Sequence, residues 1–151
     1  MPVYTPIIAP ADLNTKIYPE VQAVITRGDA SISIKAISSA ISEVKMYLSK
    51  YDLVAMFGSV TGNTAATYQD EFLTDLVKSV ATWHLIRLAN PSVDVAITRS
   101  GYEDAISSLK KIQAGLCQPD GWPYLQTINP NIPEGDAIEW TARRKRHNYF
   151  Y

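Results

Sequence analysis

Few side chains in this sequence have the chemistry of a catalytic base, a nucleophile or a metal ligand, and their spacing limits what each could do. His84 stands among the apolar residues of a predicted helix, and the other histidine, His147, is far along the chain. A single histidine on an apolar face is more often a hydrogen-bonded structural residue than a base or a ligand. Cys117 is the only cysteine, so there is no cysteine cluster for zinc, and no residue close in sequence would activate its thiol. These positions give little support for an active site.

Two further patterns resemble sites only in their letters. Glu103 and Asp104 are adjacent in a predicted helix, so their side chains point in different directions and cannot act as an acid–base pair. The glycine-rich stretch GSVTGNT, residues 58–64, has no lysine and follows no predicted strand, unlike a phosphate-binding loop. We therefore expect a protein that is not an enzyme and that holds neither a cofactor nor a metal. An enzyme that uses His84 or Cys117 is the weakest alternative.

The pattern best suited to binding is the last stretch of the sequence, TARRKRHNYFY, residues 141–151. Arginine and aromatic residues dominate the energetics of protein interfaces, and exposed aromatic clusters mark contact surfaces. A solvated basic tail is the alternative to a binding segment. The candidate contact residues here are Arg143, Arg144, Lys145, Arg146, Tyr149, Phe150 and Tyr151.

Charge is divided unevenly along the chain. The residues through Ala142 hold all 15 acidic side chains and 10 of the 14 lysines and arginines, a net charge of −5, whereas the last nine residues carry +4. An acidic body is a poor general DNA binder, because affinity for duplex DNA comes mainly from neutralising phosphates. The asymmetry therefore bears on partners rather than on the fold.

Hydrophobic spacing predicts three amphipathic helices. Apolar side chains recur at intervals of three and four from Ile34 to Tyr51, which predicts a helix over residues 30–50. A wider apolar stripe from Phe72 to Leu88 predicts a second helix over residues 69–89. The third predicted helix covers residues 101–114. Between the last two, SVDVAITRSG alternates like a strand but has no partner strand, so a loop or short helix is equally compatible.

Shorter elements and their boundaries follow from local chemistry. Pro19 opens a short predicted helix, Gly28 and Asp29 supply its end and the next N-cap, and Gly115 fits the left-handed position after the third helix. The fold class is thus all-α, a small bundle of three longer and one or two short helices. We expect a helical body over residues 1–117.

Residues 118–151 are expected to form an extended C-terminal arm, because prolines and glycines are dense between Pro119 and Gly135. The arm nevertheless keeps large apolar side chains, including Trp122 and Trp140, which disordered linkers avoid. It must therefore lie on its own body or on another molecule, and we count both tryptophans among the candidate partner-binding residues.

The remaining composition suggests a reducing, non-membrane setting. No apolar run approaches the ~20 residues that cross a bilayer. The N-terminal sequence has neither a basic region nor a long apolar stretch, so we expect no signal peptide.

The order of the helical segments resembles that of the head–tail connector (adaptor, or head-completion) proteins of tailed phages and prophages. The matching stretches cover most of residues 11–117. They are ADLNTKI at 11–17, IKAISSAISEVKMYLSKYDL at 34–53, FLTDLVKSVATWHLIRLANP at 72–91, and RSGYEDAISSLKKIQAGLC at 99–117. The loop around Gly62 and the tail depart from the common pattern.

This resemblance implies a structural subunit of the virion, present in the host cytoplasm during assembly. Such proteins form a ring, usually of about twelve copies, beneath the portal protein. The ring extends the DNA channel and offers a platform for a downstream tail or stopper protein. The resemblance implies neighbouring copies and the portal as partners, with genomic DNA passing through and no sequence-specific contact. The basic and aromatic tail would then fasten the subunit to a neighbour or to the portal.

A small DNA-binding regulator is the alternative function. Its basic tail would neutralise phosphates and its aromatic residues would stack on bases. The acidic body opposes this, and no predicted helix has the polar and basic recognition face of a helix-turn-helix.

Overall fold

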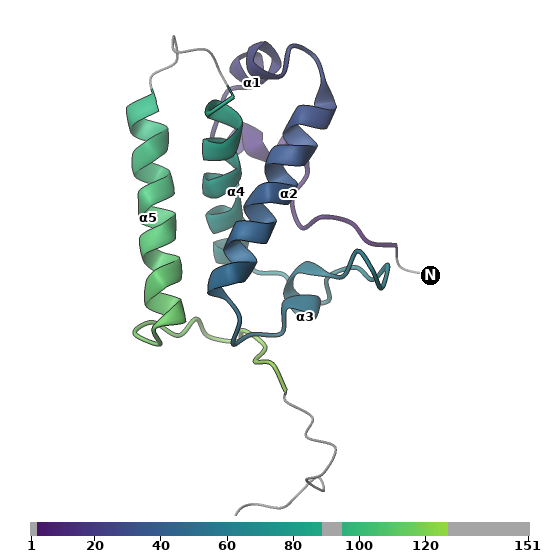
Figure 1. The fold of residues 1–151 in the computed structure, drawn as a ribbon, viewed down its shortest axis with the longest axis vertical. Coiled ribbons are helices and arrows are strands. Elements are labelled where there is room, and N and C mark those ends of the chain that lie inside the picture. Colours follow the sequence, from purple (N-terminus) through teal and green to yellow (C-terminus); the bar gives the residue numbers. More distant parts are fainter. Residues whose placement is uncertain (1–2, 89–94, 127–151) are drawn as a thin grey trace, which may run out of the picture.

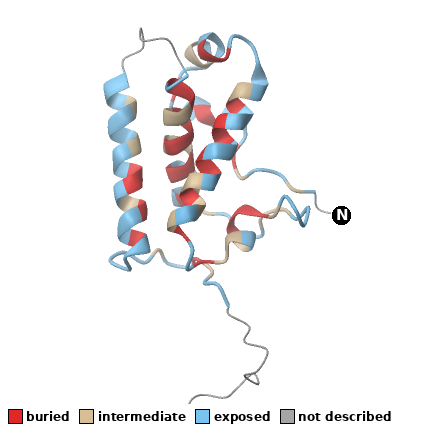
Figure 2. Ribbon diagram, viewed as in Figure 1, coloured by how far each residue is buried: buried red, intermediate tan, exposed pale blue. Residues whose placement is uncertain are grey.

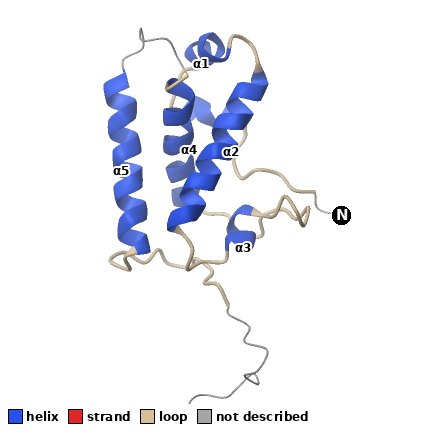
Figure 3. Ribbon diagram, in the orientation of Figure 1, coloured by secondary structure: helices blue, strands red, loops and turns tan. Residues whose placement is uncertain are grey.

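The computed structural model describes residues 3–88 and 95–126, and in that part the chain is helical with no strand. The elements are the 3₁₀ helix η1 (Pro10–Thr15) and the α-helices α1 (Pro19–Thr26), α2 (Ala30–Tyr47), α3 (Leu53–Phe57), α4 (Glu71–Ile86) and α5 (Val95–Gln113). Figure 1 shows α2, α4 and α5 side by side with α4 in the middle, while α1 and α3 lie at opposite ends of this layer. The expected all-α bundle with three longer helices is confirmed, with three short helices in place of one or two (Figure 3).

The core lies where α4 meets its two neighbours (Figure 2). α4 is the most deeply buried helix because α2 and α5 both pack against it. Its buried apolar residues, Leu73, Leu76, Val77, Val80, Ala81, Leu85 and Ile86, face Ala36, Ile37, Ala40, Ile41 and Val44 of α2 and Ala105, Ile106, Leu109 and Ile112 of α5. The bundle is therefore stabilised mainly by apolar burial along these two helix pairs.

Three aspartates begin the helices as N-caps. Asp29 accepts a hydrogen bond from the backbone N–H of Ser31 (2.8 Å), Asp52 accepts from two N–H groups of α3 (both 3.0 Å), and Asp70 accepts from Leu73 N–H (3.0 Å). Each satisfies backbone donors that a helix start leaves unpaired. The expected cap at Asp29 is confirmed, and hydrogen bonding to Ser31 lowers the pKa of its carboxyl group.

Three apolar residues that were expected on the buried faces of the long helices are exposed instead. Ile34 is 53% exposed, and the buried face of α2 instead begins at Ser33. Phe72 and Leu88, at the two ends of the stripe predicted for residues 69–89, are 47% and 63% exposed. Apolar residues at the margins of a helix stripe turn toward solvent because only about a third of the helix surface meets its neighbours.

The third long helix is longer than expected, because the alternating stretch is helical from Val95 onward. The alternating apolar residues of this stretch do not form the buried face of a strand, since Ile97 is 79% exposed. An i,i+4 ion pair joins Arg99 Nε to Glu103 Oε1 (2.8 Å) on this turn of the helix. At the other end, Gly115 takes the expected left-handed conformation, with φ of 76°.

No helix within residues 3–88 and 95–126 is long and apolar enough to cross a membrane.

Candidate functional site

Of the nine predicted contact residues, Trp122 alone lies within the described part of the chain. The other eight lie outside the described residues: Trp140, Arg143, Arg144, Lys145, Arg146, Tyr149, Phe150 and Tyr151. The structure therefore shows how the first residues of the arm, up to Gln126, meet the helical body.

Trp122 is buried in the protein's own core rather than presented to a partner. Its side chain is only 4% exposed, and its ring meets Tyr51 edge to face (5.4 Å between centroids, 76°) and lies 6.4 Å from the ring of Phe72. The expectation that Trp122 binds a partner directly is therefore corrected. Burial of the large indole ring in this aromatic pocket is favourable. Trp122 therefore attaches the start of the arm to the helical body of the same chain.

A carboxylate fixes the orientation of this indole. Trp122 donates from Nε1 to Asp70 Oδ2 (3.0 Å), and the same oxygen accepts from Leu73 N–H at the start of α4 (3.0 Å). A buried tryptophan needs a partner for its N–H, and a carboxylate at a helix N-terminus is favoured by the helix dipole. Asp70 thus joins the arm to the first turn of the central helix.

Backbone hydrogen bonds continue the attachment beyond Trp122. Asp52 N–H donates to Pro123 O (2.9 Å), and Leu125 N–H donates to Lys50 O (3.1 Å), so the two segments run antiparallel. The rings of Tyr51 and Tyr124 stack with centroids 4.9 Å apart. We call residues 50–52 together with 122–125 the arm clasp. Packing therefore continues to Leu125, eight residues beyond the boundary expected at Cys117.

The outer side of the arm clasp carries apolar surface. Tyr124 and Leu125 are each 53% exposed, and Val54, just after the clasp on α3, is 55% exposed. Burial, followed by the hydrogen bond with Tyr124, raises the pKa of the Tyr51 hydroxyl. Exposed apolar side chains therefore border the hydrogen-bonded residues of the arm clasp.

A second cluster of polar groups joins the three long helices. Glu43 of α2 is bound by His84 of α4 (Oε2 to Nε2, 2.7 Å) and accepts a hydrogen bond from the Tyr102 hydroxyl of α5 at Oε1 (2.7 Å). Trp83 stacks on Tyr102 with centroids 5.5 Å apart. The hydrogen bond from Tyr102 to Glu43, together with burial, raises the pKa of Tyr102 to about 12.

This arrangement is best explained as an interhelical link. Both carboxylate oxygens of Glu43 are engaged by side chains of the other two long helices, so this cluster joins α2, α4 and α5. His84 is hydrogen-bonded as expected, although its side chain is 24% exposed rather than fully in the core. Neither Glu43 nor Tyr102 was expected from the sequence as a member of this cluster. No local signal could pair them, since 59 positions separate the two residues.

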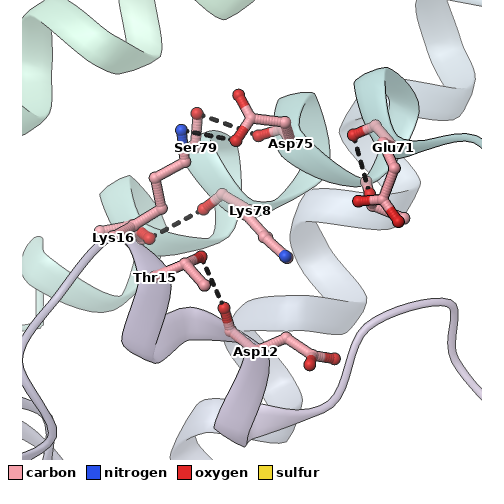
Figure 4. A network of polar contacts seen from close by, with 9 residues as sticks. Asp12, Thr15, Lys16, Glu71, Asp75, Lys78 and Ser79 are labelled. Carbon is pink, nitrogen blue, oxygen red and sulfur yellow. Dashed lines mark hydrogen bonds and ion pairs between the residues drawn. The ribbon is translucent and has the colours of Figure 1, made fainter.

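The N-terminal segment is tied to the other side of α4. Lys16, just after η1, pairs with Asp75 (Nζ to Oδ1, 2.7 Å), and Thr15 donates to the backbone oxygen of Asp12 (Figure 4). A hollow of about 420 Å³ lies nearby, with Tyr68, Glu71 and Lys78 among its lining residues. Within residues 3–88 and 95–126, no group of three or more His, Cys, Asp or Glu side chains could hold a metal ion.

Comparisons of this chain with protein-family models, with curated proteins and with solved structures found no match.

Proposed function

We propose that this protein is a structural subunit of a phage head–tail connector ring. In this role, copies of the chain assemble beneath the portal protein, extend the DNA channel and provide the platform for the tail or stopper protein. The order of the helical segments and the all-α bundle support this assignment. The structural observation that best supports the proposal is the arm clasp, which fixes residues 122–125 at one end of the bundle.

The arm clasp gives the rest of the chain a fixed origin. Trp122 is buried, and backbone hydrogen bonds hold the residues on either side of Tyr124. The residues that follow Leu125 are therefore joined directly to a segment that is anchored in the core. Because the arm clasp is already ordered, the residues that follow it lose less conformational entropy when they bind a partner.

The chemistry of the following residues suits a protein partner. Residues 143–146 are four consecutive cations and residues 149–151 are three aromatics. In the connector role, the cations meet acidic surface on the portal or on a neighbour, and the aromatic rings fill apolar pockets. The ion pairs orient the arm on its partner, and the aromatic contacts supply most of the affinity.

Binding to the portal ring tests the proposal. The full chain and a variant lacking residues 141–151 would be mixed with the portal ring of the same phage or prophage and separated by sedimentation. We expect the full chain to sediment with the portal and the shortened variant to stay in solution. The variant keeps the whole arm clasp, so circular dichroism serves as the folding control. Equal binding of the two proteins would refute the role given to the arm.

Duplex DNA distinguishes the regulator alternative. If each of the four tail cations neutralised one phosphate, release of the DNA counterions would give a slope of log Kobs against log salt concentration no steeper than about −3.6. We expect neither protein to bind duplex DNA at micromolar concentration and physiological salt. Micromolar binding by the full chain that is lost in the shortened variant would favour the tail-dependent DNA-binding function instead.

A further inference from the structure

A groove between α2 and α5 is open to solvent at the end of the bundle where the arm leaves. It has a volume of about 650 Å³. Tyr47 of α2, Ile106 of α5 and Leu116, just after α5, give it apolar walls. Leu116, three residues beyond the end of α5, is 81% exposed and so presents its side chain to solvent. We call this the α2–α5 groove, and it combines apolar side chains with an opening to solvent.

The rim of the α2–α5 groove is positively charged. Lys110 and Lys111 both line it and both are exposed. The helix dipole accounts for lysines at the end of α5 but supplies no partner for their ammonium groups. Neither lysine forms an ion pair with any residue in the part of the chain that the structure describes. Glu103 also lines the groove, but it is already paired with Arg99.

The chain contains one segment with the complementary chemistry. Residues 134–140 read EGDAIEW, and this segment holds all three acidic residues found after Gln126. Two large apolar side chains, Ile138 and Trp140, alternate with the carboxylates near its end. An acidic and apolar peptide matches a groove with apolar walls and a lysine rim, because the same contact buries surface and pairs charge.

The arm begins close enough to use such a groove. Leu125 is hydrogen-bonded to the backbone of Lys50, and Lys50 Nζ donates to Gln113 O at the end of α5 (2.9 Å). The eight residues from 126 to 133 can span about 26–29 Å when extended, and Pro130 and Pro133 favour an extended path. The last described residues of the arm lead away from the lower end of the bundle and from α5 (Figure 1). This direction favours the groove of another copy over the chain's own.

We propose that residues 134–140 of one copy bind in the α2–α5 groove of a neighbouring copy. The contact deepens the proposed function, on which it rests for the presence of neighbouring copies, because it assigns the link between adjacent subunits of the ring. It leaves the basic and aromatic end of the arm free for the portal. Portal binding and docking between copies can therefore fail separately.

Disulfide trapping between two full-length variants tests the docking. Cys117 follows Leu116, is exposed and is the only cysteine, so it reports on the groove. One protein would carry Cys117→Ser with Ile138→Cys, and the other would be the unchanged chain. Under mild oxidation we expect a mixed disulfide between the two proteins to exceed either self-linked dimer, with the linked peptides identified by mass spectrometry. Cys117→Ser with Asn129→Cys, in the spacer before the docking segment, is the matched control and should link no more than at random.

Charge reversal tests the recognition itself. Lys110→Glu with Lys111→Glu, placed in the Cys117-containing partner, should slow the mixed disulfide by about tenfold. Glu134→Lys with Glu139→Lys in the other protein should restore most of that rate. Both lysines are exposed, so circular dichroism should be unchanged by their replacement.

Three results would overturn the proposal. They are a mixed disulfide no more frequent than in the spacer control, a rate unaffected by charge reversal, and a single chain carrying Ile138→Cys that links only to its own Cys117. The last result would place the segment in the groove of its own copy. Each of these outcomes leaves the portal-binding experiment unaffected.

Discussion

Replacement of Trp122 by alanine would show whether the start of the arm belongs to the folded body. The side chain is 4% exposed, packs against Tyr51 and Phe72, and donates to Asp70. Removal of a buried tryptophan costs about 3–5 kcal/mol, because both the packing and the filled volume are lost. A domain of this size has about 5–15 kcal/mol of stability in total, so the loss is a large fraction. The expected decrease in melting temperature is about 10–20 °C.

Two matched variants separate the contributions. Trp122→Phe keeps an aromatic ring but removes the donor to Asp70, and a hydrogen bond to a partly exposed carboxylate contributes about 1–2 kcal/mol. Leu125→Ala changes a neighbouring side chain that is 53% exposed, and we expect a loss of about 0.5 kcal/mol. Asp70 still accepts from Leu73 in both variants, so the N-cap of α4 is retained.

Urea unfolding followed by circular dichroism would measure these differences. The expected order of unfolding free energy is the unchanged chain and Leu125→Ala highest, Trp122→Phe intermediate and Trp122→Ala lowest. If Trp122→Ala cost less than about 1 kcal/mol, the indole would contribute no core packing. The arm clasp would then be an incidental contact, and the arm would have no fixed origin.

Two other variants test separate parts of the account. Tyr102→Phe should lower stability by about 1–2 kcal/mol at pH 7 after allowance for partial exposure. Because the hydrogen bond to Glu43 raises the pKa of Tyr102 to about 12, its contribution is complete below the ordinary tyrosine value of 10.0 and is lost as pH rises through 12. A difference between the two proteins that stayed constant from pH 9 to 12 would contradict this assignment. Gly58→Ala should cost about 3 kcal/mol or more by thermal unfolding, since φ is 73° and an added Cβ would lie 2.5 Å from the Thr64 carbonyl oxygen. Gly28→Ala, also at positive φ but in open space, should cost only about 1 kcal/mol, and equal costs would show that the close approach at Thr64 is unimportant.

Features with local causes were predictable from the sequence. Asp29 could be identified as an N-cap because an aspartate between a glycine and an apolar repeat has that chemistry. Gly115 was recognised for the same kind of reason, at the junction of a lysine-rich helix end and a proline-rich segment. The order of the three long helices followed from the spacing of their apolar residues.

Features that depend on distant partners were not predictable. Trp122 reads as a surface anchor in a proline-rich arm, and its burial requires the Asp70 carboxylate 52 positions earlier. Val95 and Ile97 alternate like a strand, yet they belong to a helix whose remaining turns pack on α4. In each case tertiary contacts outweigh the local pattern, and a single sequence does not carry the pairing that decides the outcome.

Electron microscopy of the portal ring mixed with the full chain tests the central claim most directly. The connector assignment is supported if a ring of helical subunits appears on one end of the portal, with each subunit in contact with its neighbours and density from the arm reaching another molecule. A portal that remains bare, with the chain still monomeric by native mass measurement in the same mixture, would contradict it.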